Sequence, residues 1–153
     1  MKKVLIAVDE SKGSLSVIDT FLDIFSCMRP EEVILLYVEK LEGGPMMDAM
    51  LGGPEMAAMK EALKGTDYQN MLDKKAEKVI DFYRAAFDKN NVAGIRTVVS
   101  EGHPADEIIA TAKVEGVGMI LLGSRGKRKN IYLMGSVSRE VANRSDIPVL
   151  IAK

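Results

Sequence analysis

Five short, mostly apolar or β-branched runs recur along the chain, and none follows the alternation of a half-exposed strand. They occupy residues 4–8 (VLIAV), 33–38 (VILLYV), 95–99 (IRTVV), 118–122 (GMILL) and 149–152 (VLIA). Continuous runs of this kind are typical of parallel strands that are buried on both faces. The pattern therefore predicts a parallel sheet with helices on both sides.

Helical patterns separate these runs. The first apolar stripe follows Ser11 and Ser14, either of which suits the N-cap, and consists of Leu15, Ile18, Leu22 and Phe25. The clearest stripe comes next, opposite a charged face, and consists of Leu72, Ala76, Val79, Ile80, Tyr83 and Phe87. A third helix is predicted from Pro104 to about Gly116, because proline and the acidic Asp106 and Glu107 suit a helix N-terminus. A fourth is predicted from about Gly135 to Asn143.

Strands that alternate with helices predict an α/β sandwich with right-handed crossovers. One segment breaks the alternation. Residues 40–67 contain two Gly-Gly pairs, two prolines and five methionines, and a connection of 28 residues is long for a compact domain. We expect one domain over residues 1–153, with a flexible methionine-rich connection at 40–67.

Composition excludes several classes of protein. Twenty-one basic and 22 acidic residues leave a net charge of −1, which argues against a generic nucleic-acid or membrane-surface binder. The single cysteine, Cys27, excludes an internal disulfide framework and a thiolate metal cluster, and we expect it to pack as a small apolar residue. The apolar run before Asp9 is too short for the core of a signal peptide. No apolar run in the sequence is long enough to span a membrane. We expect a cytoplasmic protein.

Candidate chemistry lies in the loops after the strands, because ligands of open α/β sheets collect at the carboxyl ends. Asp9 follows the first run, and Gly123-Ser124-Arg125-Gly126 follows the fourth. Gly135-Ser136 then begins a helix. Glycine backbone and a helix N-terminus are the parts that hold a phosphate. A purely structural interpretation stays open, in which Gly123 and Gly126 end a strand and Gly135 permits close packing. No Walker sequence is present.

These residues resemble the universal stress protein family. The resemblance rests on Ala7-Val8-Asp9, on VILLYV at 33–38, on EGHPA at 101–105, and on GSRGKRKNIYLMGSVSREV leading into IPVLIAK. It covers the whole chain apart from the methionine-rich connection. It implies an open five-stranded sheet in the order 3-2-1-4-5, of the Rossmann-like and adenine nucleotide alpha hydrolase-like type. It also implies a homodimer, formed through the terminal strand at 148–153.

The family contains members that bind ATP and members that do not. The ATP-binding pattern is Gly, two residues, Gly, nine residues, then Gly followed by Ser or Thr. Gly123, Gly126 and Gly135-Ser136 match it, but only eight residues lie between Gly126 and Gly135. We favour binding of ATP, or of ADP or AMP, with Mg²⁺ or Mn²⁺ bridging the phosphates.

The resemblance also implies roles for single residues. Asp9 would accept the ribose hydroxyls, Val38 would meet adenine through its backbone, and Gly126, Gly135, Ser136 and Val137 would hold phosphates. Arg125 or Lys127 would add positive charge. The full nucleotide-binding set implied is Ala7, Val8, Asp9, Val38, Gly123, Ser124, Arg125, Gly126, Gly135, Ser136, Val137 and Ser138.

Three functions compete: a nucleotide-binding stress-response protein, a dimeric interaction module without nucleotide, and a slow ATPase or autophosphorylating enzyme. The residues present no clear general base, so we expect binding without efficient turnover. His103 is the single histidine, and we interpret it as the residue that leads into the helix at Pro104. We assign no catalytic residue and no metal ligand. The partner protein is not identified by the sequence.

Overall fold

The computed structural model describes residues 2–40, 54–55, 58, 61–62, 64–124 and 134–153. Five parallel strands form one sheet in the order β3-β2-β1-β4-β5, which confirms the predicted order. The strands are β1 (Lys3–Val8), β2 (Glu32–Glu39), β3 (Ile95–Glu101), β4 (Met119–Gly123) and β5 (Val149–Ala152). Each therefore lies within two residues of the apolar run that predicted it.

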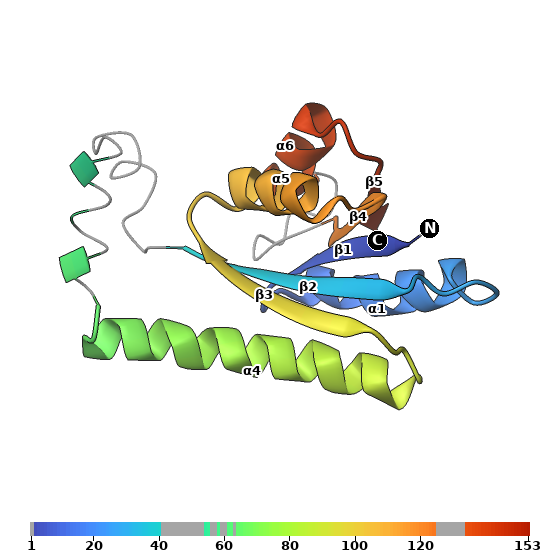
Figure 1. Ribbon diagram of the computed structural model, residues 1–153, viewed down its shortest axis with the longest axis horizontal. Coiled ribbons are helices and arrows are strands. Elements are labelled where there is room, and N and C mark those ends of the chain that lie inside the picture. The colour runs from blue at the N-terminus through green and yellow to red at the C-terminus, as the bar shows by residue number, and fades with distance from the viewer. Residues whose placement is uncertain (1, 41–53, 56–57, 59–60, 63, 125–133) are drawn as a thin grey trace.

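Helices cover both faces of the sheet (Figure 1). On one face lie α1 (Lys12–Ile24) and α4 (Asp67–Lys89), and on the other lie α5 (Pro104–Glu115) and α6 (Ser136–Arg144). The side chains of each strand point alternately to the two faces. Leu35 and Leu121 thus pack against α1 and α4, whereas Ile34 and Ile120 pack against α5 and α6.

Local sequence explains where these helices begin and end. The Ser11 hydroxyl accepts the N–H of Ser14 at the start of α1, and the Thr66 hydroxyl accepts that of Gln69 at the start of α4. Pro104 is the first residue of α5, and Gly116 ends that helix with a φ of 62°. A left-handed conformation of this kind is why glycine suits the position after a helix.

The apolar stripes predicted for α4 and α1 agree to different degrees with the residues that the structure buries. All six predicted apolar positions of α4 are the ones that the structure buries. In α1, by contrast, Val17 and Phe21 are fully buried while Leu15 is 41% exposed. Ile18, Leu22 and Phe25 of the predicted stripe pack on the core beside them, so only Leu15 falls outside the buried face.

One expectation about packing was wrong. Cys27 is exposed, because the chain leaves α1 at Phe25 and the cysteine lies in the turn beyond the helix. Most of the methionine-rich connection at 40–67 lies outside the described residues. Among the described helices, none combines the length and hydrophobicity needed to cross a bilayer.

Candidate functional site

The carboxyl ends of β2, β1 and β4 lie side by side at one edge of the sheet. Ala7 pairs with Leu122 of β4, and Val8 pairs with Tyr37 of β2. Asp9, Val38 and Ser124, each one or two residues further on, therefore stand at about the same level on three neighbouring strands. Because β1 makes its last pair at Tyr37, Val38 extends past the end of β1. This is the edge at which the sequence predicted a ligand.

Asp9 is fixed by the start of α1. Its Oδ1 accepts the N–H of Ser11 at 2.8 Å, and its own N–H donates to the Ser14 hydroxyl at 3.2 Å. The Tyr83 hydroxyl of α4 donates to the Asp9 carbonyl oxygen at 3.4 Å. Asp9 is only partly buried, so the side chain combines a fixed position with access from solvent.

A chain of hydrogen bonds joins β4, β5 and α6. The N–H of Ser124 donates to the Ala152 carbonyl at 2.7 Å, and the N–H of Gly135 donates to the Ser124 carbonyl at 2.8 Å. The Ser138 hydroxyl donates to the Gly123 carbonyl at 2.6 Å. Ser124 and Ser138 are both buried. Their contacts therefore hold the N-terminus of α6 against the end of β4.

The N-terminus of α6 is not capped by a side chain. Its N-cap is Gly135, which has no side-chain hydrogen bond to offer, and the first helical residue, Ser136, is exposed. The first N–H groups of a helix have no partner within the helix and carry a partial positive charge. Since no side chain of the described residues caps them, these amides are suited to an anion.

Gly123 has a structural reason to be glycine. A Cβ atom at this position would lie 2.3 Å from the carbonyl oxygen of Gly13 and 2.9 Å from the Cα of Ser14. The end of β4 and the start of α1 thus touch through their backbones. The structure supports the close-packing interpretation for Gly123, and this contact brings the loop of Asp9 next to the end of β4.

The other predicted site residues divide into three groups. Val8 is a core side chain, so it can offer a ligand only backbone groups, whereas Ala7 and Val137 are partly buried along the α5 and α6 face. Val38 is half-buried on the same face. Arg125, Gly126 and Lys127 lie outside the described residues.

A cavity of about 250 Å³ lies beside Asp9, between α1 and α4. It is lined by Asp9, Glu10, Leu15, Val79, Phe82 and Tyr83. None of these lining residues belongs to β2, β4 or α6. The cavity therefore adjoins Asp9 on the α4 side, and its lining does not include the first residues of α6.

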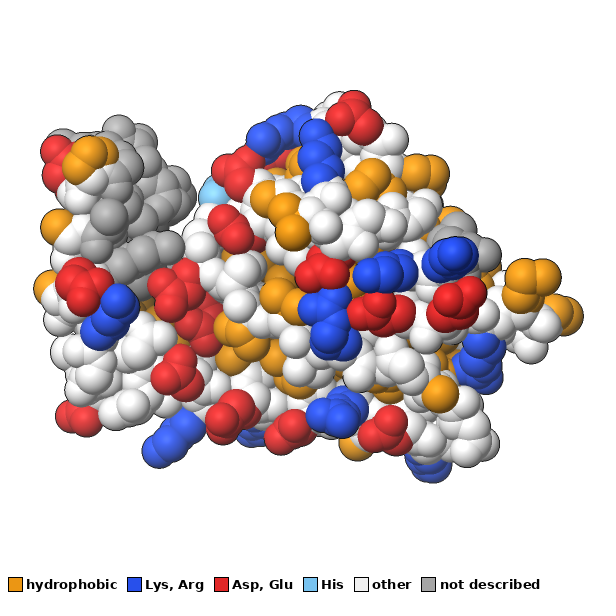
Figure 2. All heavy atoms as spheres, in the orientation of Figure 1, with side chains coloured by type: hydrophobic (Ala, Val, Ile, Leu, Met, Phe, Trp, Pro, Cys, Tyr) orange, Lys and Arg blue, Asp and Glu red, His pale blue; other side chains and the backbone are white. Residues whose placement is uncertain are grey.

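A buried carboxyl group next to Val38 was missed by the sequence reasoning. Glu39 is only 3% exposed, and its Oε1 has no hydrogen-bond partner within the described structure. Burial, followed by the charges of Asp73 and Glu101, raises the pKa of Glu39. Figure 2 shows acidic side chains gathered near the ends of β2 and β3. An acidic residue directly after a buried strand was the available signal.

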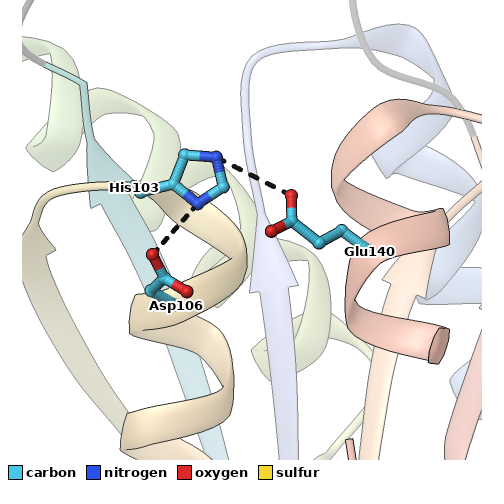
Figure 3. A group of neighbouring side chains, drawn as sticks. All are labelled: His103, Asp106 and Glu140. Atoms are coloured by element: carbon cyan, nitrogen blue, oxygen red, sulfur yellow. Dashed lines mark ion pairs between the residues drawn. The ribbon is translucent and has the colours of Figure 1, made fainter. Parts of the chain in front are cut away.

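The surroundings of His103 were also missed. The residue does precede α5 as predicted, but its ring lies between the carboxylates of Asp106 and Glu140 (Figure 3). The spacing of three residues from His103 to Asp106 was the available signal. No signal in the sequence indicated that Glu140 also contacts the ring, because that contact depends on how α5 and α6 pack.

A comparison with models of known families decides the relationship. The model of the universal stress protein family matches residues 1–153. The chain belongs to the universal stress protein family. The earlier resemblance is thereby confirmed, and it extends over the full sequence.

Individual relatives agree with the assignment. The universal stress protein MJ0577 of Methanocaldococcus jannaschii is 28% identical over 99% of this chain and 94% of its own. Its solved structure gives a TM-score of 0.72, covering 99% of this chain and 95% of that one. YxiE of Bacillus subtilis is 27% identical over 99% of this chain and 98% of its own.

Two more distant family structures contain an adenine nucleotide. A universal stress protein in complex with cAMP is 22% identical, with a TM-score of 0.58 over 99% of this chain and 96% of that one. A family protein of Arabidopsis thaliana with AMP bound is 19% identical, with a TM-score of 0.67 over 100% of this chain and 92% of that one. At these identities the likeness shows a shared fold.

Proposed function

We propose that this chain binds ATP, or the related ADP or AMP, as a dimeric stress-response protein with slow or no hydrolysis. The observation that carries the proposal is the N-terminus of α6, which has no side-chain cap and is held against the end of β4 by the Ser138–Gly123 and Gly135–Ser124 hydrogen bonds. β4 is the neighbour of β1, the strand that Asp9 follows. Amides and a carboxylate at neighbouring strand ends suit the phosphate and the ribose of a nucleotide. The AMP and cAMP complexes of proteins with the same fold add support.

Each group has a role in this proposal. Asp9 accepts the ribose hydroxyls, and the backbone of Val38 meets adenine. The amides of Gly135, Ser136 and Val137, with the Ser136 hydroxyl, bind phosphate oxygens. Ser138 keeps α6 in place through Gly123, and Mg²⁺ or Mn²⁺ joins the phosphates through their own oxygens and water.

One test removes the phosphate donors of Ser136 without removing the helix. Proline is well tolerated at the first helical position, where its N–H has no intrahelical partner. Ser136→Pro therefore keeps α6 while deleting two phosphate donors, the amide and the hydroxyl of residue 136. We expect titration calorimetry to show binding of AMP and ATP weakened about tenfold or more, which is the effect of losing a hydrogen bond to a charged group, with binding of adenosine little changed. Asp67→Pro, at the first position of α4, is the matched control.

A second test addresses the ribose. Asp9→Asn keeps an oxygen for the N–H of Ser11 but removes the charge, so the fold should persist while nucleotide and adenosine both bind at least tenfold more weakly. Asp19→Asn, on the exposed side of α1, is the control. Absence of heat with ATP, ADP and AMP at millimolar concentration would refute nucleotide binding and favour an interaction module. A rate of phosphate release from ATP as high as the turnover of kinases, about 1–100 s⁻¹, would contradict slow hydrolysis.

The dimer is proposed through β5. This strand pairs with β4 on one side and is the last strand of the sheet, and an unpaired edge can join a second copy. Ile151→Lys on β5 should convert a dimer to a monomer in light-scattering measurements. Val99→Lys on β3, the opposite edge, should leave it a dimer. A wild-type protein that stays monomeric at micromolar concentration would refute this part of the proposal.

A further inference from the structure

A histidine and two carboxylates converge where α5 and α6 pack against each other (Figure 3). His103 Nδ1 lies 3.3 Å from Asp106 Oδ2, and His103 Nε2 lies 3.7 Å from Glu140 Oε2. One potential ligand atom from each residue can be chosen so that all three lie within 4.8 Å of one another. The nucleotide proposal does not use any of these side chains.

Arg144 already holds the other oxygen of each carboxylate. Its NH2 group lies 2.7 Å from Asp106 Oδ1, and its NH1 group lies 2.6 Å from Glu140 Oε1. Both carboxylates are thus turned so that their second oxygens face the imidazole ring. Carboxylates that bind metal ions are usually oriented by outer hydrogen bonds of this kind. Arg144 supplies that support from within α6, one helical turn beyond Glu140.

The three groups lie close enough to close on a small divalent ion. Donors bound to zinc at about 2.0–2.2 Å in a tetrahedron lie roughly 3.3–3.6 Å apart. The two short contacts involve different ring nitrogens, Nδ1 with Asp106 at 3.3 Å and Nε2 with Glu140 at 3.7 Å, and one ion can bind only one of them. One nitrogen and one oxygen from each carboxylate lie within 4.8 Å of one another, so the donors must approach by up to about 1.5 Å to reach the zinc spacing. The side chains of His103, Asp106 and Glu140 are 49%, 52% and 35% exposed, so they have room to adjust and water has access to the remaining positions.

We propose that His103, Asp106 and Glu140 bind one divalent transition-metal ion, Zn²⁺ in the first place, with water completing its coordination. An imidazole ligand favours zinc and its neighbours over Mg²⁺ and Ca²⁺, which prefer oxygen ligands alone. The bound ion joins the N-terminus of α5 to α6. It is distinct from any ion carried by nucleotide phosphates, because its ligands are protein side chains.

The test uses untagged protein without nucleotide, in a Cys27→Ser background that removes the exposed thiol. We expect calorimetry with Zn²⁺ to give one site per chain. His103→Asn and Glu140→Gln should each weaken binding at least tenfold, while Glu77→Gln, an exposed glutamate on α4, should not change it. Circular dichroism checks that each variant is folded.

Nuclear magnetic resonance gives a second readout that needs no substitution. His103 is the single histidine of the sequence, so the imidazole signals report on this residue alone. Zn²⁺ should shift them in a saturable way, and Co²⁺ should broaden or shift them by paramagnetism. Zinc binding that is equal in His103→Asn and wild type, or imidazole signals unmoved by saturating Zn²⁺, would overturn the proposal and leave an ion-pair network only.

Discussion

Replacing Gly123 by alanine tests the contact that brings β4 against α1. The new methyl group would lie 2.3 Å from the Gly13 carbonyl oxygen, so the two backbones must separate by about 0.7 Å even to reach 3.0 Å. Neither neighbour is a flexible side chain that can move aside. Overpacking of a tight site costs about 1–3 kcal/mol, and we expect the upper end. About 3 kcal/mol lowers the Tm of a chain of 150–250 residues by roughly 6–12 °C.

Gly116→Ala is the control for backbone strain alone. Gly116 has a φ of 62°, but an added Cβ would meet nothing within 4 Å. Its expected cost is about 1–2 kcal/mol, from the left-handed conformation. Thermal unfolding followed by circular dichroism compares the two variants.

Hydrogen exchange adds a local readout for the same contact. Gly123→Ala should accelerate exchange of the Ser124 and Gly135 amides, whose hydrogen bonds depend on this contact. Gly116→Ala should not. A Tm for Gly123→Ala no lower than that of Gly116→Ala, with unchanged exchange at these amides, would refute the reasoning.

Three further predictions concern buried polar groups. Ser138→Ala removes the 2.6 Å bond to the Gly123 carbonyl and should lower the free energy of unfolding by about 1–3 kcal/mol in urea titrations; a loss within error would contradict the role given to this hydroxyl. Because the pKa of Glu39 is raised in the folded state, its contribution to stability is full at acidic pH and is lost as the pH rises through the folded pKa. Glu39→Gln should therefore raise the Tm at pH 7.5 and lose this advantage towards pH 4, and an equal effect at both pH values would count against it. Burial raises the pKa of Tyr37 and of Tyr83 to about 12 each, so no more than two of the four tyrosines should ionise near pH 10 in an ultraviolet titration. The stability from these two phenols should be full below about pH 10 and fall as the pH rises to about 12, and a single four-tyrosine transition near pH 10 in folded protein would contradict this.

The sequence was informative where burial alone determines the pattern. The stripe of α4 was predicted residue by residue, because that helix packs with one face on the sheet and the other in solvent. The stripe of α1 was predicted in part, because Val17 and Phe21 share the sheet face with Ile18 and Leu22 and leave Leu15 exposed. The contact between the backbones of Gly13 and Gly123 could not be predicted, because apolar periodicity does not record such contacts.

The candidate site shows the same division. Its strand-end position follows from topology, so Asp9 and Ser136 could be found from the sequence. The contacts that each residue makes in the folded chain could not be predicted from the sequence. Glycine at 123 is explained by packing against α1, and the hydroxyl of Ser138 is engaged by a carbonyl on another element. These roles depend on distances between segments that only the folded chain brings together.

The central place of β1 affects how the chain is made. Its pairing partners in β2 end at Tyr37, but its partners in β4 begin at Met119. During synthesis, one side of β1 therefore has no strand to pair with until more than a hundred further residues have been made. At about 5–20 residues per second this interval is roughly 6–22 s. An apolar strand edge is exposed throughout it, which is the period in which a nascent chain is open to chaperones and to misassembly. The end of β1, which Asp9 follows, and the end of β4, which holds α6, become neighbours only through that pairing, so ligand binding at this edge would report that the sheet is complete.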